Sequence, residues 1–312
     1  MDSNIKALFN NFPAEEDLQN IIRHASSTSI GSEFSAKDIE NWLENFKGEV
    51  FEIGYERRLA LWLLSHFTYY NKKEVDHLCK VLYLDLIHLA LKDIDLSLTT
   101  IDETINSFFS KANIISAEET SGSGGFIAYI FRQVNCLPIW GLFNFSLENI
   151  SDTIDNIIVI DDVTLSVGTA GQKYKFWEKA RKLYPNKSFY LLTLIATENS
   201  TRDLYDTFGV TVVSSIKLDD RDKCFSKESD TFSSFPDLTE SAHKFATHYG
   251  SKIGITNPLG YNDGQYAFGF YYNTPDNTLP IFWGQKNEWI PILRRYHKNY
   301  KTKKYLQNER FL

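Results

Sequence analysis

The pattern of apolar and polar residues changes near residue 113. Before this point apolar side chains recur at the spacing of amphipathic helices, most clearly in residues 54–70 and 72–92, which form a candidate helical hairpin. After it, short and continuous apolar runs alternate with helical segments, which is typical of a mainly parallel sheet covered on both faces. We therefore predict an α/β protein with an N-terminal helical domain over residues 1–110 and an α/β domain over residues 111–312.

The pattern also predicts the elements of the second domain. The expected strands are residues 113–119, 137–143, 156–161, 188–197, 210–216, 266–272 and 281–283, and the expected helices are residues 124–134, 171–184 and 200–209. Residues 217–244 are polar and poor in aliphatic side chains, so we expect a long excursion there. Its basic residues would suit a lid over a phosphate ligand: Lys217, Arg221, Lys223 and Lys227.

Composition narrows the class of protein. The 312 residues are 43% hydrophobic, and 33 basic against 40 acidic residues give a net charge of −7, which argues against broad electrostatic binding to nucleic acid. The basic stretch 294–310 is interleaved with tyrosines and reads either as a phosphate contact or as a solvated face, so nucleic-acid binding stays open. Three widely spaced cysteines, no signal-peptide pattern and no apolar run of about 18 residues predict a soluble cytoplasmic protein without a membrane anchor.

The candidate chemistry begins in "NIIVIDDVTLSVGTAGQ", residues 156–172. An apolar strand ends there in Asp161 and Asp162, and in open parallel sheets ligands bind beyond the carboxyl ends of the strands. Paired carboxylates accept hydrogen bonds from ribose hydroxyls, directly or through a divalent ion, and the loop that follows offers hydroxyl and backbone N–H groups to a phosphate. The loop residues expected to hold the phosphate are Thr164, Ser166, Val167, Gly168 and Thr169. The alternative is that the aspartates only cap the next helix.

This stretch resembles the phosphoribosyl diphosphate (PRPP) motif of type I phosphoribosyltransferases. The resemblance implies the phosphoribosyltransferase type of parallel sheet, PRPP or a related ribose phosphate as ligand, and Mg²⁺ as cofactor. It also implies that Asp161 and Asp162 are the catalytic residues and contact the metal. Val167 stands where such motifs usually have a small residue, which is consistent with a weakened phosphate site.

A glycine-rich segment about forty residues upstream, "TSGSGGFIAYIFRQ", fits the same resemblance, because these transferases hold the diphosphate in a backbone loop that leads into a helix. Glycines allow positive φ and close backbone approach, and serines can donate hydrogen bonds. The residues expected to contact the diphosphate are Ser121, Gly122, Ser123, Gly124, Gly125 and Arg132. The alternative is a merely flexible turn.

Residues 260–284, "GYNDGQYAFGFYYNTPDNTLPIFWG", together with "ALWLLSHFTYY", resemble the phosphoribosyltransferase-like proteins of bacterial conflict systems, some of them associated with retrons. This resemblance spans about Tyr55 to Arg295 and implies a role in anti-phage defence with a protein partner from the same system. The candidate residues for the acceptor side of the pocket are Tyr261, Asn273, Asn277, Thr278 and Trp283. The alternative is that Asn, Pro and Asp only form tight turns here.

Three functions fit these residues. The first is transfer chemistry at the ribose C1 of PRPP, in a defence effector or sensor or in a metabolic enzyme. The second is a catalytically inactive nucleotide-binding regulatory module, which Val167 and the absence of an identifiable general base favour. The third is a toxic effector gated by a partner. The sequence leaves open the acceptor, whether turnover occurs and the oligomeric state.

Overall fold

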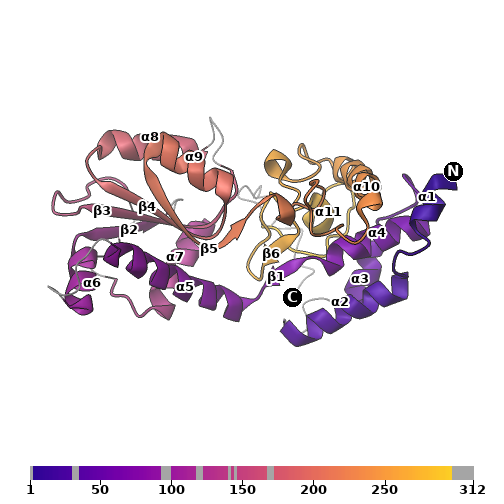
Figure 1. Cartoon of the computed structure of the whole chain (residues 1–312), viewed down its shortest axis with the longest axis horizontal. Helices are drawn as coiled ribbons and strands as arrows, with labels where there is room; N and C mark the ends of the chain where they lie inside the picture. The colour runs from indigo at the N-terminus through magenta and orange to yellow at the C-terminus, as the bar shows by residue number, and fades with distance from the viewer. Residues whose placement is uncertain are drawn as a thin grey trace, which may run out of the picture. The chain divides into compact units, whose positions relative to one another are not determined.

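The computed structural model describes residues 3–29, 35–92, 100–116, 122–139, 142–143, 146–166 and 172–296. Its contacts divide the chain into two compact units. Residues 1–69 and 237–312 form the terminal unit, which is built from both ends of the chain, and residues 70–236 form the central unit. The elements of both units are labelled in Figure 1. None of the helices in the described residues is long and apolar enough to cross a membrane.

The central unit contains a four-stranded, fully parallel sheet. Its strands are β2 (Ala112–Ser116), β3 (Asn156–Thr164), β4 (Ser188–Thr197) and β5 (Val210–Leu218), in the order β2-β3-β4-β5. Val159 faces Ile115 on one side and Leu191 on the other, which sets the register. Strands in such a sheet are buried on both faces, which is why the sequence of β3 is continuously apolar up to Asp161.

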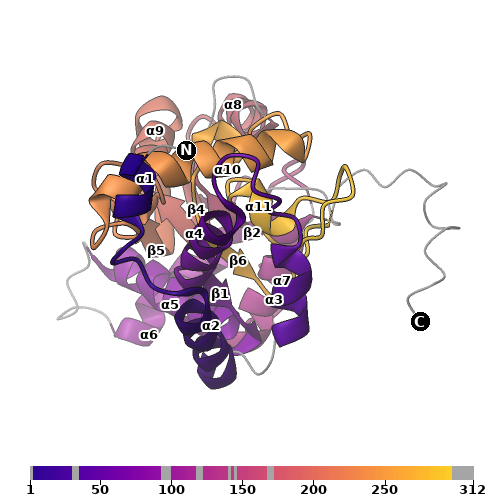
Figure 2. The ribbon, with the colours of Figure 1, turned by 90° about the vertical axis from the view of Figure 1, so that its right-hand side faces the viewer.

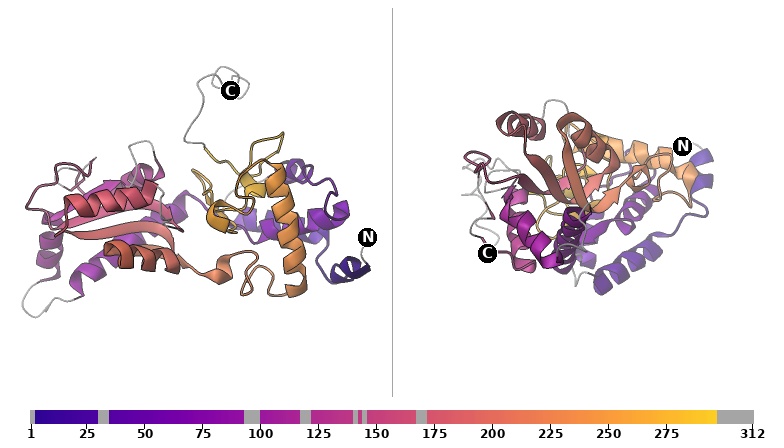
Figure 3. Two further views of the ribbon diagram at one scale, coloured as in Figure 1. Left: turned by 90° about the horizontal axis from the view of Figure 1, so that it is seen from above. Right: turned by 60° about the vertical axis from the view of Figure 1, so that its left-hand side comes forward.

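Helices cover both faces of this sheet (Figures 1 and 3). The helices of the central unit are α5 (Lys72–Leu91), α6 (Ile101–Ser110), α7 (Ser123–Val134), α8 (Gln172–Leu183) and α9 (Glu198–Phe208). α8 and α9 lie side by side on one face, where Trp177 and Leu204 pack with Val159 and Leu191. α5, α6 and α7 lie on the other face, and α7 packs on β2 and β3. The predicted fold class, a parallel sheet flanked by helices, is confirmed.

One segment extends the sheet beyond β2. Phe143 forms a parallel bridge with Ile114, and the Ile114 N–H donates to the Leu142 carbonyl at 2.7 Å. The predicted strand 137–143 is therefore wrong as a regular strand, since its described residues make only this bridge. The bridge nevertheless shows that, after β2, the chain passes along the edge of β2 that faces away from β3. It then returns to form β3 on the opposite edge of β2. The order of chain segments across the sheet thus reverses between β2 and β3.

The terminal unit is mainly helical, with α1 (Ser3–Leu8), α2 (Glu15–Ser29), α3 (Ala36–Leu43), α4 (Ile53–Ser65), α10 (Thr239–Lys252) and α11 (Pro280–Trp283). α2 packs on α4, and α10 contacts both α4 and α11 (Figure 2). A two-stranded sheet joins β1 (Thr68–Tyr70) to β6 (Phe268–Phe270). The first seventy residues therefore fold with the end of the chain. This division differs from the boundary predicted near residue 110, because α5 and α6 pack with the sheet of the central unit.

Two predicted strands of the terminal unit are corrected. Residues 281–283 form helix α11 instead of a strand, because Pro280 fixes the backbone φ that suits the first position of a helix. The strand predicted over residues 266–272 is limited to β6, since the chain turns back after Phe270, whose N–H donates to the Asn273 carbonyl at 2.9 Å.

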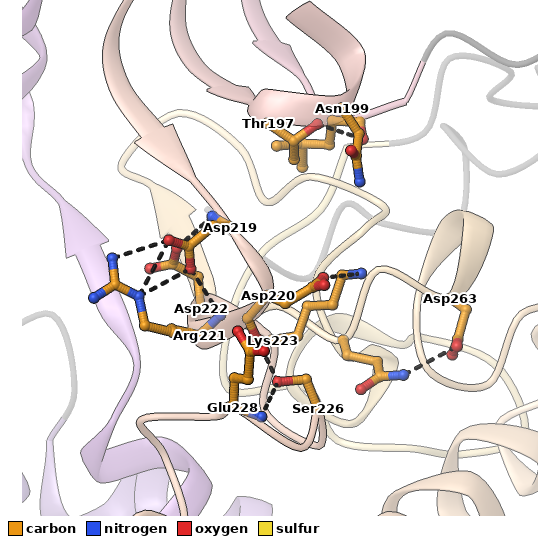
Figure 4. A network of polar contacts seen from close by, with 12 residues as sticks. Thr197, Asn199, Asp219, Asp220, Arg221, Asp222, Lys223, Ser226, Glu228 and Asp263 are labelled. Carbon is orange, nitrogen blue, oxygen red and sulfur yellow. Dashed lines mark hydrogen bonds and ion pairs between the residues drawn. The ribbon is translucent and has the colours of Figure 1, made fainter. Parts of the chain in front are cut away.

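The predicted polar excursion is a shorter, hydrogen-bonded segment. β5 continues to Leu218 and α10 begins at Thr239, with the short 3₁₀ helices η1 (Asp220–Asp222) and η2 (Pro236–Leu238) between them. In Figure 4 the Arg221 guanidinium faces Asp219, at 2.9 Å, and Lys223 reaches Asp220 at 2.7 Å. The predicted lid lysine Lys217 belongs to β5, and Lys227 lies in a turn. Arg221 and Lys223 are thus already paired with carboxylates of their own segment.

A buried carboxylate joins three segments of the terminal unit by hydrogen bonds. Glu56 of α4 has no exposed surface. It accepts hydrogen bonds from the backbone N–H groups of Gly48, Val50 and Phe51, at 2.6, 2.7 and 3.1 Å, and from the Tyr249 hydroxyl of α10 at 2.5 Å. One side chain therefore joins the turn before α4, α4 itself and α10.

We expect Glu56→Gln to destabilise the protein strongly. An amide NH₂ would face donors in either orientation, and each buried donor left unsatisfied costs about 1–3 kcal/mol. Tyr249→Phe removes the hydroxyl that donates to Glu56 and accepts the Lys47 N–H, and it should lower the free energy of unfolding by about 1–3 kcal/mol. Urea unfolding measures both changes, with Glu44→Gln in an exposed ion pair as the control. Equal stability of Glu56→Gln and wild type would show that this carboxylate is dispensable.

Candidate functional site

The carboxyl ends of β2 and β3 bring the two predicted phosphate-binding segments together. The glycine-rich segment follows β2 and leads into α7, and Asp161 and Asp162 lie at the end of β3, next to β2. This is the place where the order of the sheet reverses, and in open α/β sheets the ligand crevice lies at such a switch point. Residues about forty positions apart in the sequence therefore meet at one edge of the sheet.

Gly124 makes the closest approach between these segments. A Cβ atom at this position would lie 2.9 Å from the Ile160 carbonyl oxygen and 3.5 Å from Oδ1 of Asp161. Only glycine lets α7 start this close to β3. The N-cap of α7 is Gly122, which has no side chain that could accept a hydrogen bond from the backbone N–H groups of the first turn. A helix N-terminus in this state is suited to an anion.

Asp161 is buried and ion-paired, with 2% of its surface exposed. Its Oδ2 lies 2.6 Å from Nζ of Lys173, in the first turn of α8, and its Oδ1 accepts the Asp162 N–H at 2.9 Å. Nζ of Lys173 also donates to the Val163 carbonyl at 2.7 Å. Lys173 is not among the predicted site residues; its only signal in the sequence is a lysine in the first turn of the helix after the Asp-Asp loop.

Asp162 is equally buried but has no ion-pair partner of its own among the described residues. Its Oδ1 accepts the Val163 N–H at 2.8 Å, and the Ser123 side chain hydrogen-bonds to the carboxylate. Burial, followed by the negative charge of Asp161, raises the pKa of Asp162 to about 7, although Lys173 and these hydrogen bonds act in the opposite direction. Asp162 therefore takes up a proton near neutral pH more readily than an ordinary aspartate does.

The other predicted ligand contacts are distributed unevenly. Thr164 is 1% exposed, and its hydroxyl finds no hydrogen-bond partner among the described residues. Ser166 is half-buried just after the end of β3, and Gly125 lies in the first turn of α7. Arg132 lies in the last turn of α7, with its guanidinium 5.7 Å from the centre of the Tyr129 ring, so it is remote from the helix N-terminus. Ser121, Val167, Gly168 and Thr169 lie outside the described residues.

The predicted acceptor residues belong to the terminal unit and hold its turns. The buried Asn277 amide donates to the Tyr261 carbonyl at 3.0 Å, the Thr278 hydroxyl to the Phe268 carbonyl at 2.6 Å, and the Trp283 indole to the Thr278 carbonyl at 2.8 Å. Oδ1 of Asn273 accepts the Tyr296 N–H at 3.0 Å. These contacts fit the turn-forming alternative; their role in binding an acceptor stays a prediction.

Comparison with known proteins decides the family. A family model described as PRTase-CE matches residues 39–295, which covers parts of both units. The chain belongs to the PRTase-CE family. It is a phosphoribosyltransferase-like protein, as the Asp-Asp motif and the parallel sheet predict. No curated protein and no solved structure matches it.

The carboxylates of this PRTase-CE protein fit a magnesium ion only together with a ligand. No group of three or more His, Cys, Asp or Glu side chains in the described residues is arranged to hold a metal. Mg²⁺ is commonly held by one or two carboxylates together with phosphate oxygens and water, and Asp161 and Asp162 are the carboxylates that would supply that share. The remaining ligands would have to come from the bound phosphate and water.

Stability should depend on pH through Asp162. The pKa of Asp162 in the folded protein is raised from its ordinary value of 3.8 to about 7, so between these values the folded protein binds a proton that the unfolded chain does not. The free energy of unfolding should therefore rise as pH falls from 8 towards 5 and drop again as pH rises through 7. We expect Asp162→Asn to lose this component. Urea unfolding at several pH values without divalent cations tests it, and parallel pH profiles for variant and wild type would contradict it.

Gly124→Ala should disturb the contact between α7 and β3. The added Cβ would be too close to the Ile160 backbone oxygen, and overpacking of this kind costs about 1–3 kcal/mol. Gly54→Ala in α4 is the matched control, because its Cβ meets nothing within 4 Å and the change should stabilise the helix by about 0.5–1 kcal/mol. Thermal unfolding of the two variants gives the comparison, and a fully stable Gly124→Ala protein would refute the close approach.

Proposed function

We propose that this PRTase-CE protein binds PRPP or a related ribose phosphate or nucleotide at the carboxyl ends of β2 and β3, and acts as an effector or sensor in bacterial anti-phage defence. The observation that carries the proposal is the meeting of Gly124 with Ile160 and Asp161 at the switch point of the sheet. It supports a single ligand that touches both segments, with its charged groups beside the N-terminus of α7.

The arrangement suggests which part of the ligand each segment would hold. Asp161 and Asp162 would accept hydrogen bonds from the ribose hydroxyls, as adjacent carboxylates at a strand end do. The uncapped first turn of α7 and the Ser123 hydroxyl would face the diphosphate. Thr164 and the loop that follows it would hold the 5-phosphate.

For transferase chemistry, the residues would act mainly by positioning and by electrostatics. As the C1–O bond to the diphosphate breaks, positive charge develops on the ribose ring, and the carboxylate of Asp161 would stabilise that charge. The N-terminus of α7 would stabilise the departing diphosphate. Bound Mg²⁺ would contribute neutralisation of the diphosphate charge. The acceptor and its general base stay open.

A specific observation also favours a binding module without turnover. Asp161 already carries an ion pair with Lys173, and Val167 departs from the small residue usual in the motif. Incubation with PRPP and Mg²⁺, with and without nucleotides, separates the two functions when diphosphate release is followed by phosphorus NMR. Release supports the enzyme, whereas binding without release supports the sensor.

The defence role rests on the resemblance of residues 60–70 and 260–284 to conflict-system proteins. It predicts that cells carrying the protein with its neighbouring genes resist phage infection. Plaque counts test this role independently of the ligand, because loss of resistance on deletion of the gene does not depend on which ribose phosphate is bound.

We expect Asp161→Asn combined with Asp162→Asn to abolish binding of PRPP. Hydrogen bonds to a charged group contribute about 1.5–3 kcal/mol each, so the loss of both carboxylates should lower affinity by about a hundredfold or more. Calorimetric titration measures the affinity, and circular dichroism checks that the variant is folded. Asp203→Asn with Asp206→Asn on α9 is the control, since both side chains are exposed. Unchanged PRPP affinity in the first variant, or a wild type that binds no ribose phosphate, would overturn the proposal.

A further inference from the structure

Lys173 occupies the position on Asp161 that a cation bound with the ligand would use. Its Nζ lies 2.6 Å from Oδ2 of Asp161 and 2.7 Å from the Val163 carbonyl oxygen. The two partners are unequally accessible, because the lysine side chain is 38% exposed and the aspartate side chain 3%. The lysine thus approaches from the surface and neutralises a carboxylate that water hardly reaches.

The surroundings of this pair explain why Asp161 needs a cation. Asp161 and Lys173 line a small cavity of about 10 Å³, together with Thr164 and with apolar side chains of α8, α9 and β4. The apolar residues are Phe176, Trp177, Leu191 and Leu204. A carboxylate in such surroundings is costly when it lacks a partner, and Asp162 beside it adds repulsion between like charges. Asp161 therefore needs a positively charged partner, whether or not a ligand is bound.

A divalent cation and the lysine ammonium cannot both occupy this face of the carboxylate, because they repel each other at contact distance. We propose that Lys173 is a built-in counter-cation that competes with divalent metal for Asp161, so that the ligand-free protein binds a divalent cation only weakly. The metal would then enter together with a phosphate ligand, whose oxygens supply the additional contacts needed to displace the lysine. This inference rests on the proposed function for the role of the metal.

A purely structural role makes a different prediction. If Lys173 only fastens α8 to β3, its loss lowers stability without changing the affinity for metal. If it competes, its loss must raise that affinity. Lys173→Gln separates the two roles, because glutamine keeps a hydrogen-bond donor near the Val163 carbonyl but carries no charge.

The experiment titrates Mn²⁺ alone, with no ribose phosphate, and follows the free ion by electron paramagnetic resonance. We expect Lys173→Gln to bind Mn²⁺ about tenfold more tightly than wild type, since the buried carboxylates have lost their counter-charge. Lys179→Gln is the matched control, because Lys179 lies on the same helix and pairs with the exposed Glu148 at 2.9 Å. Adding Asp161→Asn to Lys173→Gln should remove the gain.

Each outcome decides the inference. A folded Lys173→Gln protein that binds Mn²⁺ no more tightly than wild type overturns it, as does an equal gain in Lys179→Gln. If Lys173→Gln unfolds without metal, MgCl₂ should raise its melting temperature while NaCl of equal ionic strength does not; absence of this rescue also overturns it. Failure of wild type to bind PRPP would remove the proposed function, yet leave the Mn²⁺ result standing.

Discussion

Two adjacent carboxylates are buried at the end of one strand, and the rest of the site depends on how their charges are tolerated. Asp161 and Asp162 are 2% and 7% exposed, so neither can rely on water for solvation. The structure treats them differently. Asp161 lies against the ammonium group of Lys173, whereas the raised pKa of Asp162 lets that side chain take up a proton near neutral pH. The alternative, in which the aspartates only cap a helix, leaves the burial of both side chains unexplained.

The same constraint explains the local geometry around the pair. The backbone N–H groups of Asp162 and Val163 each donate to the carboxylate of the preceding residue. The backbone at the end of β3 therefore solvates its own two carboxylates. α8 places Lys173 on one side, and α7 brings Ser123 and the uncapped helix N-terminus to the other. Gly124 is what allows α7 to begin so close to β3. The ion pair with Lys173, the backbone hydrogen bonds and the close approach at Gly124 thus belong to one arrangement.

The sequence predicted those features that depend on a continuous pattern. Strands β3, β4 and β5 could be located because buried parallel strands are long apolar runs, and the Asp-Asp pair stood out because it interrupts such a run. The strand predicted over residues 281–283 was wrong, since three apolar residues fit a strand or a helix equally well, and the structure has a helix that begins at Pro280. Two features depend on tertiary packing, which periodicity does not encode. One is that both ends of the chain fold into the terminal unit, and the other is the contact between Lys173 and Asp161.

Backbone strain distinguishes residues 260–265, which lie in the stretch that resembles conflict-system proteins. Asn262, Asp263 and Gln265 have φ between 52° and 57°, a region that L-residues seldom occupy, and Gly260 has φ of 96°. Asn277 holds this turn through the Tyr261 carbonyl, which accounts for a buried amide without any ligand. Tyr261 itself is 43% exposed. Among the five candidate acceptor residues, Tyr261 therefore has the side chain that the fold leaves most accessible. A strained turn that exposes an aromatic ring is a reason to test this residue for ligand binding, and its role in recognition stays a prediction.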